Sequence, residues 1–362
     1  MSATRILVSG IVLDQPMGGV RRHNAELLPR IAKLLEAKGG ELALLTGRGG
    51  LGFEPPSNVR VIPSDVPSSP LLVRAARETK ALGAAIAQAA EAGRPFDMVH
   101  VAHLPAPRTL PVPMSLTLHD LRSLDLEHTP FSRRLVAKAV VGRALNRAQR
   151  VFTVSEHMRT RLVRDWPEVE PKLLVAPNGA DHLPVLERNQ APEAPLLHVG
   201  HVEPRKNLDL LLRALALDTT LPDLLLVGAP KHDEDQRLLA LAQSLKISHR
   251  IRLAGPCPDE DLPALLASAA AVVLPSHLEG FGIVALEAQR ARVPLAISSA
   301  GALAETAAES ARVFPPDDPQ ACALAIRQAL QQSAADLEPA AIRAEGYTWD
   351  AAARIFVSGW AT

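Results

Sequence analysis

The chain has 362 residues, of which 47% are hydrophobic, 22% are charged and only 3% are aromatic. This length fits two domains of ordinary size, and the composition excludes a disordered chain and a polytopic membrane protein. Few aromatic rings argue against a reader of single-stranded nucleic acid, which stacks bases on such rings.

The formal net charge is zero, but it is divided unevenly along the chain. Residues 1–180 hold 24 basic and 16 acidic side chains, which gives +8, and residues 181–362 carry −8. The first half is therefore expected to meet an anionic partner, although drift in solvated surface charge is an equally good explanation.

Cys257 and Cys322 are the only cysteines. They are too few for a thiolate zinc site or a disulfide framework, and this suits a reducing compartment. The chain reaches its first strand pattern at Ile6 without a long apolar leader, and no uncharged apolar run approaches the roughly 20 residues that cross a bilayer. We expect a cytoplasmic protein.

Short apolar runs alternate with amphipathic stretches along the chain, which predicts parallel strands covered by helices on both faces. The first series of predicted strands is Ile6–Ser9, Leu42–Thr46, Met98–Val101, Ser115–Leu118, Val151–Val154 and Leu173–Val175. The second series is Leu196–Val199, Leu224–Val227, Ile251–Leu253, Ala271–Leu274, Leu295–Ile297 and Ala311–Phe314. Two such series predict an α/β fold with two doubly wound, Rossmann-like domains, whose ligands bind at the carboxyl ends of the strands.

The best domain boundary is residues 182–195, where HLPVLERNQAPEAP has three prolines and no apolar period. The predicted domains are residues 1–181 and 196–345. Residues 346–362 carry the only tyrosine and two of the three tryptophans, which predicts a terminal helix that crosses back to the first domain.

Two turns of the first domain carry candidate site residues. Gly18 and Gly19 follow the first predicted strand and open a helix, so their backbone can approach a reacting centre closely. His119 ends a later strand, where it can hydrogen-bond a transferred group. Paired glycines and a lone histidine are more often structural, so neither signal decides by itself.

The segment from Phe131 to Arg150 holds six basic residues and no acidic one, with apolar residues between them. Arg133, Arg134 and Lys138 lie in its first half. Such a helix can lie on an anionic membrane surface. A helix packed on its sheet with a solvated basic face is at least as good an interpretation.

The first turn of the second domain is GHVEPRKN, in which Arg205 and Lys206 stand side by side and Asn207 can cap the next helix. Two fixed cations at a strand end would neutralise a diphosphate, increasingly so as it leaves with extra charge. A solvated basic turn is the alternative.

The strand ending at Leu274 leads to EGFG and a helix that begins near Ile283. Gly280 and Gly282 would let the backbone approach a ligand, and the first free amides of the helix would hold a phosphate. Glu279 precedes these glycines, and Glu287 lies one turn inside the helix, within reach of a ribose.

Three patterns are interpreted as decoys. The residues 47–52 match G-x-G-x-x-G, but prolines follow where a helix must begin. The acidic triplets 233–235 and 259–261 resemble metal-binding motifs of sugar transferases, but each begins a helical run, where acidic residues are expected.

In this order, the segments resemble the retaining glycosyltransferases of family 4, also called glycosyl transferases group 1, which have the GT-B fold. The resemblance covers nearly the whole chain, and Glu279-x7-Glu287 is its most specific element. GHVEPRKN and the GGVRRHN of residues 18–24 support it, and the subgroup with E-P-R-K-N looks most like mannosyltransferases of polysaccharide assembly.

The resemblance implies two domains that face each other across a cleft, with residues 1–181 binding the acceptor and residues 196–345 binding a nucleoside-diphosphate sugar as donor. It also implies retention of configuration and no requirement for a metal or other cofactor. Arg205 and Lys206 would stabilise the leaving group, Glu279 would hold the sugar and Glu287 the ribose. His119 would contact the sugar, with Gly18 and Gly19 over the reaction centre. Backbone amides of four residues would hold the sugar and diphosphate: Phe281, Gly282, Ile283 and Val284.

One position departs from many members of the family, since His201 stands where they have arginine, which leaves more of the cationic support to Arg205 and Lys206. GDP-mannose is the first expectation for the donor, and a glycan or polyprenyl-diphosphate-linked sugar for the acceptor. Peripheral contact with an anionic membrane is expected, and nucleic acid is not. The alternatives are a phosphorylase or hydrolysing epimerase with the same phosphate cleft, and a non-catalytic nucleotide-sugar binder.

Overall fold

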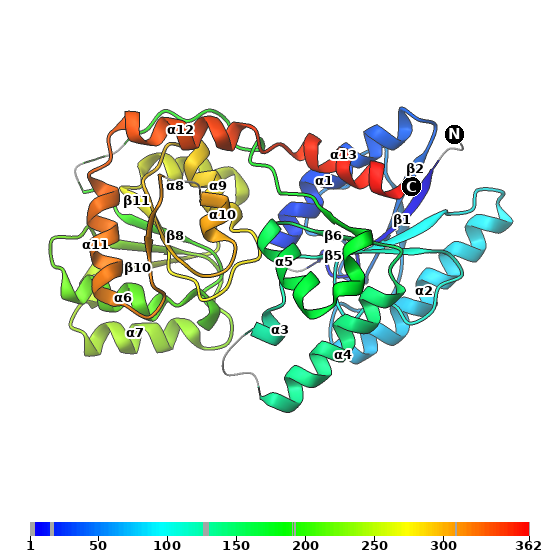
Figure 1. Ribbon diagram of the computed structural model, residues 1–362, viewed down its shortest axis with the longest axis horizontal. Coiled ribbons are helices and arrows are strands. Elements are labelled where there is room, and N and C mark those ends of the chain that lie inside the picture. The colour runs from blue at the N-terminus through cyan, green and yellow to red at the C-terminus, as the bar shows by residue number, and fades with distance from the viewer. Residues whose placement is uncertain are drawn as a thin grey trace. The chain divides into compact units, whose positions relative to one another are not determined.

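The computed structural model describes residues 4–14, 18–125, 130–189, 191, 193–307 and 310–361 (Figure 1). The chain divides into two compact units. Unit 1 comprises Met1–Asn178 together with Trp349–Thr362, and unit 2 comprises Gly179–Thr348. The chain therefore passes from unit 1 to unit 2 after Asn178, just before the proline-rich segment from 182 to 195. It returns to unit 1 at Trp349.

Unit 1 is built on a seven-stranded sheet in which all paired strands are parallel. The strand order is β3-β2-β1-β4-β5-β6-β7. The strands are β1 (Arg5–Ser9), β2 (Glu41–Thr46), β3 (Arg60–Pro63), β4 (Met98–Val101), β5 (Met114–Leu118), β6 (Arg150–Thr153) and β7 (Leu173–Val175).

The edge strand β3 is absent from the sequence prediction. Its side chains alternate between half-buried and exposed, because it lies at the rim of the sheet and pairs only with β2. It is also short and ends in Pro63, which cannot donate to a ladder. The other strands of the unit are central or strongly apolar, and the apolar runs predicted them.

Helices cover both faces of this sheet. One face packs against side chains of α2, α4 and α5, and α1 and α13 pack against each other on β2, β6 and β7. The helices of unit 1 are α1 (Gly19–Glu36), α2 (Leu71–Glu91), α3 (Arg122–Asp125), α4 (Phe131–Arg147), α5 (Glu156–Asp165), η1 (Pro167–Lys172) and α13 (Trp349–Trp360).

The last helix, α13, is an integral part of unit 1. Figure 1 shows it in red alongside the blue α1. Trp349 and Phe356 are fully buried, and the ring of Phe356 stacks on that of Phe152 in β6 with centroids 4.1 Å apart. The Nε1–H of Trp360 donates to Ser115 Oγ on β5 at 2.9 Å. Aromatic residues otherwise scarce in the chain thus cover the unit's second face.

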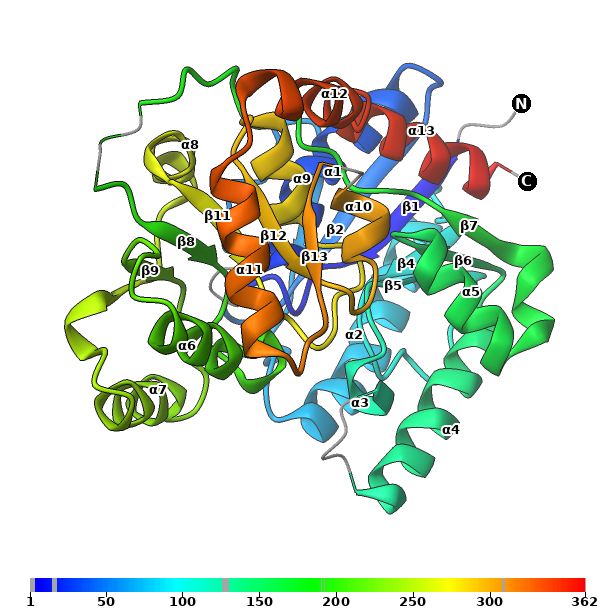
Figure 2. The same cartoon turned by 60° about the vertical axis from the view of Figure 1, so that its left-hand side comes forward.

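Unit 2 has a six-stranded sheet, again with parallel pairs, in the order β10-β9-β8-β11-β12-β13 (Figure 2). These two sheets confirm the predicted pair of doubly wound α/β domains. The strands are β8 (Leu196–Val199), β9 (Leu224–Val227), β10 (Ile251–Gly255), β11 (Ala271–Leu274), β12 (Leu295–Ser298) and β13 (Arg312–Phe314).

The helices of unit 2 separate into two layers. α6, α7 and α11 bury leucine, alanine and cysteine side chains on one face of the sheet. α8, α9 and α10 cover the other face, and α12 packs on α9. Their bounds are η2 (Pro204–Lys206), α6 (Leu208–Leu217), α7 (Glu234–Ser244), η3 (Ser248–Arg250), η4 (Asp259–Asp261), α8 (Leu262–Ser268), α9 (Ile283–Arg290), α10 (Leu303–Ala307), α11 (Pro319–Leu330) and α12 (Ala334–Glu345).

The three decoy patterns have the structures expected of them. Residues 47–52 form a turn with a bridge between Gly47 and Gly50, and no helix follows. The two acidic triplets lie at the starts of α7 and η4. Within the described ranges, no group of three or more His, Cys, Asp or Glu side chains is arranged to hold a metal ion.

Candidate functional site

Each sheet has one place where the strand order reverses direction. In unit 2 this switch point lies between β8 and β11, and in unit 1 it lies between β1 and β4. The loops after these strands diverge to opposite faces of the sheet, so a crevice for a ligand forms at their carboxyl ends.

At the switch point of unit 2, three of the predicted site residues meet. The Nζ of Lys206, from the loop after β8, is 2.5 Å from Glu279 Oε1, from the loop after β11. Arg205 Nη1 donates to Glu279 Oε2 at 3.1 Å and to the carbonyl of Leu278 at 2.8 Å. The two cations and the acid that sequence analysis proposed therefore form one cluster, although 73 residues separate Lys206 from Glu279.

Polar residues of the neighbouring strands support this cluster. Ser276 Oγ donates to Glu279 Oε1 at 2.9 Å, and Ser298 Oγ, from the end of β12, donates to the carbonyl of Ser276 at 2.5 Å. The amide of His277 donates to the carbonyl of Arg205 at 2.9 Å, which joins the two loops directly. The fully buried hydroxyls of Ser276 and Ser298 thus help to fix the orientation of the Glu279 carboxylate.

Asn207 has a different role from the predicted one. It stands at the N-cap position of α6, but its side chain makes no capping hydrogen bond. Its Nδ2 instead donates to the carbonyls of Pro275, at 3.1 Å, and Pro316, at 2.6 Å. Because its backbone is left-handed, with φ of 52°, the amide points across to the loop after β11 and ties that loop to η2.

The electrostatics of the cluster keep Glu279 ionised. Burial alone would raise the pKa of its carboxyl, but the charges of Lys206 and Arg205, with hydrogen bonds from Lys206 and Ser276, lower the pKa to about 2. Glu203 shows the same balance, since Arg205 and Lys231 outweigh its burial and lower its pKa to about 2. Arg205 therefore lies between two carboxylates.

Glycines make room for this arrangement. Gly301 has φ of 65°, and a Cβ there would lie 2.5 Å from the carbonyl oxygen and 2.6 Å from the nitrogen of Glu279. A Cβ on Gly200, after β8, would lie 3.2 Å from Lys206 Cε. Sequence analysis missed Gly301 because it follows β12 and shows its role only by contact with Glu279.

The predicted phosphate loop leads into α9 as expected. Gly282 has φ of 83° at the N-cap position of α9, which begins at Ile283. Phe281 is buried, and its carbonyl accepts a hydrogen bond from Thr306 Oγ1. Ile283 and Val284 are half-buried in the first turn, so the amides of this turn start an eight-residue helix at the carboxyl edge of the sheet.

Glu287 lies one turn inside α9, as predicted, but its described contacts differ from those of Glu279. It is 1% exposed, and Oε1 is 2.9 Å from His182 Nε2. This partner comes from the segment that was predicted to be a linker. His201 is half-buried, and burial together with the charge of Lys231 lowers the pKa of its imidazole, which favours the neutral form.

The predicted residues of unit 1 follow β1 and β5. Gly18 and Gly19 begin α1, and the next turn carries His23. The His23 ring lies edge-on to that of His119 with centroids 4.6 Å apart, and His23 Nδ1 is 2.8 Å from Asn178 Oδ1. Burial has the largest effect on the pKa of His119 and, together with the nearby His23 and His100, lowers it well below its usual value. His119 is therefore a neutral hydrogen-bonding group.

Sequence analysis missed a second polar cluster in unit 1, at the β1/β4 switch point itself. Ser9 ends β1, His103 follows β4, and both contact Glu78 from α2. These residues stand alone in apolar or helical runs, so no local pattern marks them.

The two halves of the chain match two family models. Residues 17–182 match the model described as Glycosyltransferase Family 4, and residues 187–348 match Glycosyl transferases group 1.

A similar curated protein is the O-antigen chain mannosyltransferase B of Escherichia coli, 33% identical over 59% of this chain and 60% of its own length. A D-inositol 3-phosphate glycosyltransferase of Frankia alni is 36% identical over 44% of this chain and 43% of its own length. The match thus spans less than two thirds of these curated relatives. Sucrose-phosphate synthase from Thermosynechococcus elongatus has the same fold, with a TM-score of 0.77 and 19% identity over 98% of both chains.

The ion pair makes a prediction about acid stability. Because folding lowers the pKa of Glu279 from 4.5 to about 2, its ionisation stabilises the fold above pH 4.5, and this stabilisation is lost as the pH falls toward 2. In Lys206→Met, the difference in melting temperature from the wild type should be largest at neutral pH and shrink below pH 4.5. Melting curves across this range test it, and a difference that does not depend on pH would contradict it.

The glycine contact makes a second prediction. Gly301→Ala places a methyl group against the Glu279 backbone at a positive φ, and should destabilise unit 2 by more than about 1 kcal/mol. Urea unfolding measures the change. Gly83→Ala is the matched control, since a Cβ at Gly83 in α2 would meet nothing within 4 Å, and it should be neutral or slightly stabilising.

Proposed function

This chain belongs to the glycosyltransferases of family 4, with the GT-B fold and a group 1 domain as its second half, and we propose that it transfers a hexose from a nucleoside-diphosphate sugar to a glycan or lipid-linked acceptor. The observation that carries this proposal is the cluster of Arg205, Lys206 and Glu279 at the switch point of unit 2. GDP-mannose is the proposed donor, with support from the similarity to an O-antigen chain mannosyltransferase.

The cluster suits a diphosphate because its cations are already fixed and largely buried. Lys206 and Arg205 are both anchored by Glu279, and the carbonyl of Leu278 and the carboxylate of Glu203 hold the guanidinium in place. Preorganised cations stabilise charge that develops on a leaving group without having to reorganise. We propose that Lys206 and Arg205 exchange some of their hydrogen bonds with Glu279 for hydrogen bonds to the diphosphate. Glu279 then holds hydroxyls of the sugar.

The start of α9 supports the same placement of the donor. The first amides of the helix, beginning at Ile283, favour an anion through their free N–H groups and the helix dipole. Glu287 is the proposed ribose ligand, which requires its carboxylate to share its hydrogen bonding between His182 and the diol. His201, favoured in its neutral form, adds little cationic support, so that role is left to Arg205 and Lys206.

Unit 1 supplies a neutral contact for the sugar. The Nε2 of His119 is buried and has no hydrogen-bond partner among the described residues. A neutral imidazole nitrogen pairs well with an uncharged hydroxyl and poorly with a phosphate. This is the reason for assigning His119 to the transferred sugar, and the backbone of Gly18 and Gly19 is proposed to lie over the reaction centre.

We propose that transfer retains the configuration and uses no metal ion. The acceptor oxygen bonds to the anomeric carbon on the face from which the diphosphate departs, and the bond from that carbon to the diphosphate oxygen breaks. Its electron pair leaves with the diphosphate, and the acceptor proton passes to the departing phosphate oxygen. Lys206 and Arg205 stabilise the negative charge of that group as it leaves.

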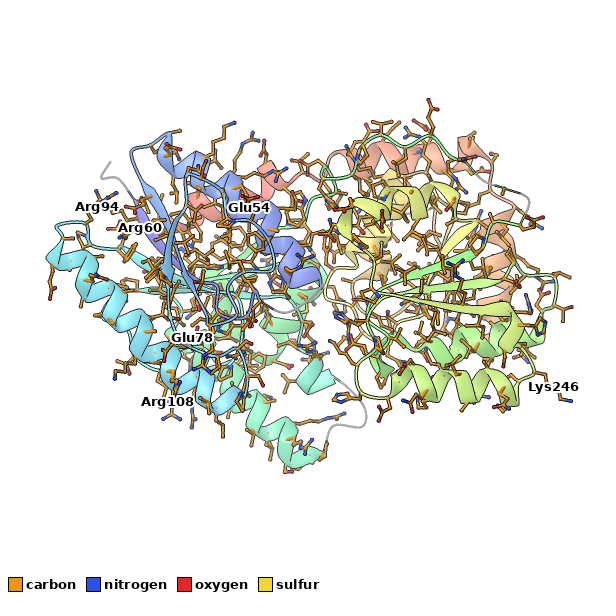
Figure 3. The ribbon with its side chains drawn as sticks, turned by 180° about the vertical axis from the view of Figure 1, so that it is seen from behind. Glu54, Arg60, Glu78, Arg94, Arg108 and Lys246 are labelled. Carbon is orange, nitrogen blue, oxygen red and sulfur yellow. The ribbon has the colours of Figure 1, made fainter. Side chains whose placement is uncertain are left out.

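Turnover tests the proposal. Lys206→Met should lower kcat with GDP-mannose and a mannoside acceptor by roughly a hundredfold or more, because a fixed cation on the leaving group is lost. The matched control is Lys246→Met, an exposed lysine of the same unit labelled in Figure 3, which should keep full activity. Circular dichroism checks the fold of both variants.

Product analysis distinguishes the alternatives. Release of free sugar without acceptor indicates a hydrolysing epimerase, and sugar phosphate formed with inorganic phosphate indicates a phosphorylase. Binding of GDP, UDP or ADP with no turnover of any donor indicates a nucleotide-sugar binder. A fully active Lys206→Met enzyme would refute the assignment of the site.

We also propose that α4 places the protein on an anionic membrane, where a lipid-linked acceptor would be met. Every buried residue of α4 lies in its second half, between Val141 and Leu145. Its first half exposes large apolar side chains: Phe131 is 76%, Leu135 54% and Val136 64% exposed.

Basic residues accompany these apolar side chains. Arg133, Arg134 and Lys138 lie in the same half of α4, and there is no acidic residue from Phe131 to Arg150. Exposed apolar residues beside basic ones are the composition of helices that lie in an anionic interface. None of the helices in the described residues is long and apolar enough to span a bilayer, so the proposed contact is peripheral.

Vesicle binding tests this surface. The wild type should sediment with vesicles of phosphatidylcholine and phosphatidylglycerol, bind phosphatidylcholine alone weakly, and be released by salt. The double variant Arg133→Glu/Arg134→Glu should bind at least about tenfold more weakly. Phe131→Ser should also weaken binding, whereas Val185→Ser, at a residue of unit 2 that is 79% exposed, should not. Equal binding by all four proteins would contradict the assignment.

A further inference from the structure

Lys231 is a further cation beside the cluster of Arg205, Lys206 and Glu279, and sequence analysis did not single it out. It follows β9, the strand next to β8, at the same carboxyl edge of the unit 2 sheet. Its Nζ donates to Glu203 Oε2 at 3.1 Å. The other oxygen of Glu203 accepts from Arg205 Nη2 at 2.7 Å. One carboxylate therefore joins Lys231 to the cluster.

The backbone of Lys231 is fixed to the loop that carries Arg205. The Lys231 amide donates to the carbonyl of Val202 at 2.9 Å, and the Val202 amide donates to the carbonyl of Ala229 at 3.0 Å. Gly228 allows this close approach, since a Cβ at its φ of 152° would lie only 1.8 Å from the carbonyl oxygen of Gly200. The side chain of Lys231 therefore starts from a rigid position, as a preorganised binding group requires.

The charges of the cluster balance without Lys231. Two cations, Arg205 and Lys206, face two carboxylates, Glu203 and Glu279. Burial would raise the pKa of both carboxyls, but the neighbouring cations lower each pKa to about 2. Both acids are therefore ionised at neutral pH, and these four charges sum to zero. Lys231 is the residue that makes the sum positive.

Other titratable groups near Lys231 leave this balance in place. Burial and the charge of Lys231 lower the pKa of His201, so its imidazole adds no further positive charge at neutral pH. Among the described residues, the acidic triplet 233–235 makes no ion pair with Lys231. Glu234 pairs with Arg237 at 2.6 Å instead, and the triplet stands at the start of α7, where the helix dipole favours acids.

Lys231 is also the cation of this group that an anion reaches most easily from solvent. Its side chain is 38% exposed, whereas those of Arg205 and Lys206 are 13% and 10% exposed. An ammonium group has three hydrogens, and Glu203 is the one acceptor that the described residues offer to Lys231. Two hydrogens therefore remain for water or for an anionic ligand.

We propose that Lys231 binds the diphosphate of the donor and supplies the net positive charge that attracts it, with Glu203 as the positioning residue shared with Arg205. This inference rests on the proposed glycosyltransferase function, since it adds a residue to the same site. An outer cation acts on the diphosphate both before and during transfer, so Lys231 contributes mainly to binding. Arg205 and Lys206, which are more deeply buried, stabilise the charge of the leaving group.

Calorimetric titration with inorganic pyrophosphate and with GDP tests the contact without turnover. Lys231→Met should raise the Kd of both ligands about tenfold, because a charge-assisted hydrogen bond is lost. The affinity for guanosine, which has no phosphate, should not change. Added salt should weaken binding of pyrophosphate less in this variant than in the wild type.

Lys246→Met is the matched control, since it removes another lysine from the surface of unit 2 and should keep the wild-type affinities. An unchanged Kd for pyrophosphate and GDP in folded Lys231→Met overturns the proposal. A wild type that binds neither ligand also overturns it.

A double-mutant cycle separates contact with the ligand from support of Arg205. If Lys231 acts only through Glu203, Lys231→Met has no further effect on the Kd of pyrophosphate in a Glu203→Gln background. If Lys231 contacts the diphosphate, the loss of about tenfold persists in that background. Lys231→Arg keeps the charge and should retain most of the affinity. Disappearance of the effect in the Glu203→Gln background contradicts the assignment.

Kinetics with GDP-mannose distinguish Lys231 from Lys206. Lys231→Met should raise the donor KM about tenfold and lower kcat by less than about threefold, because its contact exists before the transition state. Lys206→Met should act mainly on kcat. A kcat lowered as far in Lys231→Met as in Lys206→Met contradicts the binding role.

The failure of this inference differs from that of the proposed function. If Lys231→Met weakens the binding of pyrophosphate but the wild type turns over no nucleotide-sugar, the diphosphate contact stands and the transferase activity does not. If the wild type transfers mannose and Lys231→Met keeps the wild-type Kd for GDP, the activity stands and the contact does not.

Discussion

The structure of unit 2 depends on one buried ionic contact, between Glu279 and the side chains of Lys206 and Arg205. Charges held out of water require near-complete hydrogen bonding, and the surrounding residues supply it. Ser276 and Ser298 support the acid from the ends of β11 and β12, and the Asn207 amide ties the two loops together. Gly301 lets the backbone of a third loop reach the same place. The loops are therefore ordered by the cluster that the proposed donor would use.

Unit 1 follows the same physical rule with different partners for its buried acid. Its buried glutamate, Glu78, also lies where the strand order reverses, but its partners are a hydroxyl and an imidazole instead of two permanent cations. His23, His100 and His119 lie nearby as buried rings, and burial lowers the pKa of each of them. The cluster of this unit is thus polar, and Arg74, one turn before Glu78 on α2, is a cation beside it.

Most of the fold and half of the site could be predicted from sequence because the signals are local. Apolar runs predicted every central strand, and a two-residue cationic turn and an acid before glycines predicted the cluster of unit 2. What sequence analysis missed arises from contacts between distant residues. β3 is defined by its pairing with β2, and Gly301 by its contact with Glu279. Ser9, Glu78 and His103 come from three separate elements, up to 94 residues apart. Asn207 has the residue type and position of a helix cap, yet its left-handed backbone directs the amide elsewhere.

The placement of α13 has a consequence for biosynthesis. The helix completes a face of unit 1 with Trp349 and Phe356, yet all of unit 2 precedes it in the chain. A ribosome therefore synthesises the whole of unit 2 before it delivers the residues that cover Phe152 and His23. Until then the nascent first unit leaves this aromatic face open to water and to chaperones. Early termination of translation would remove the cover and leave the incomplete product to the quality-control machinery of the cell.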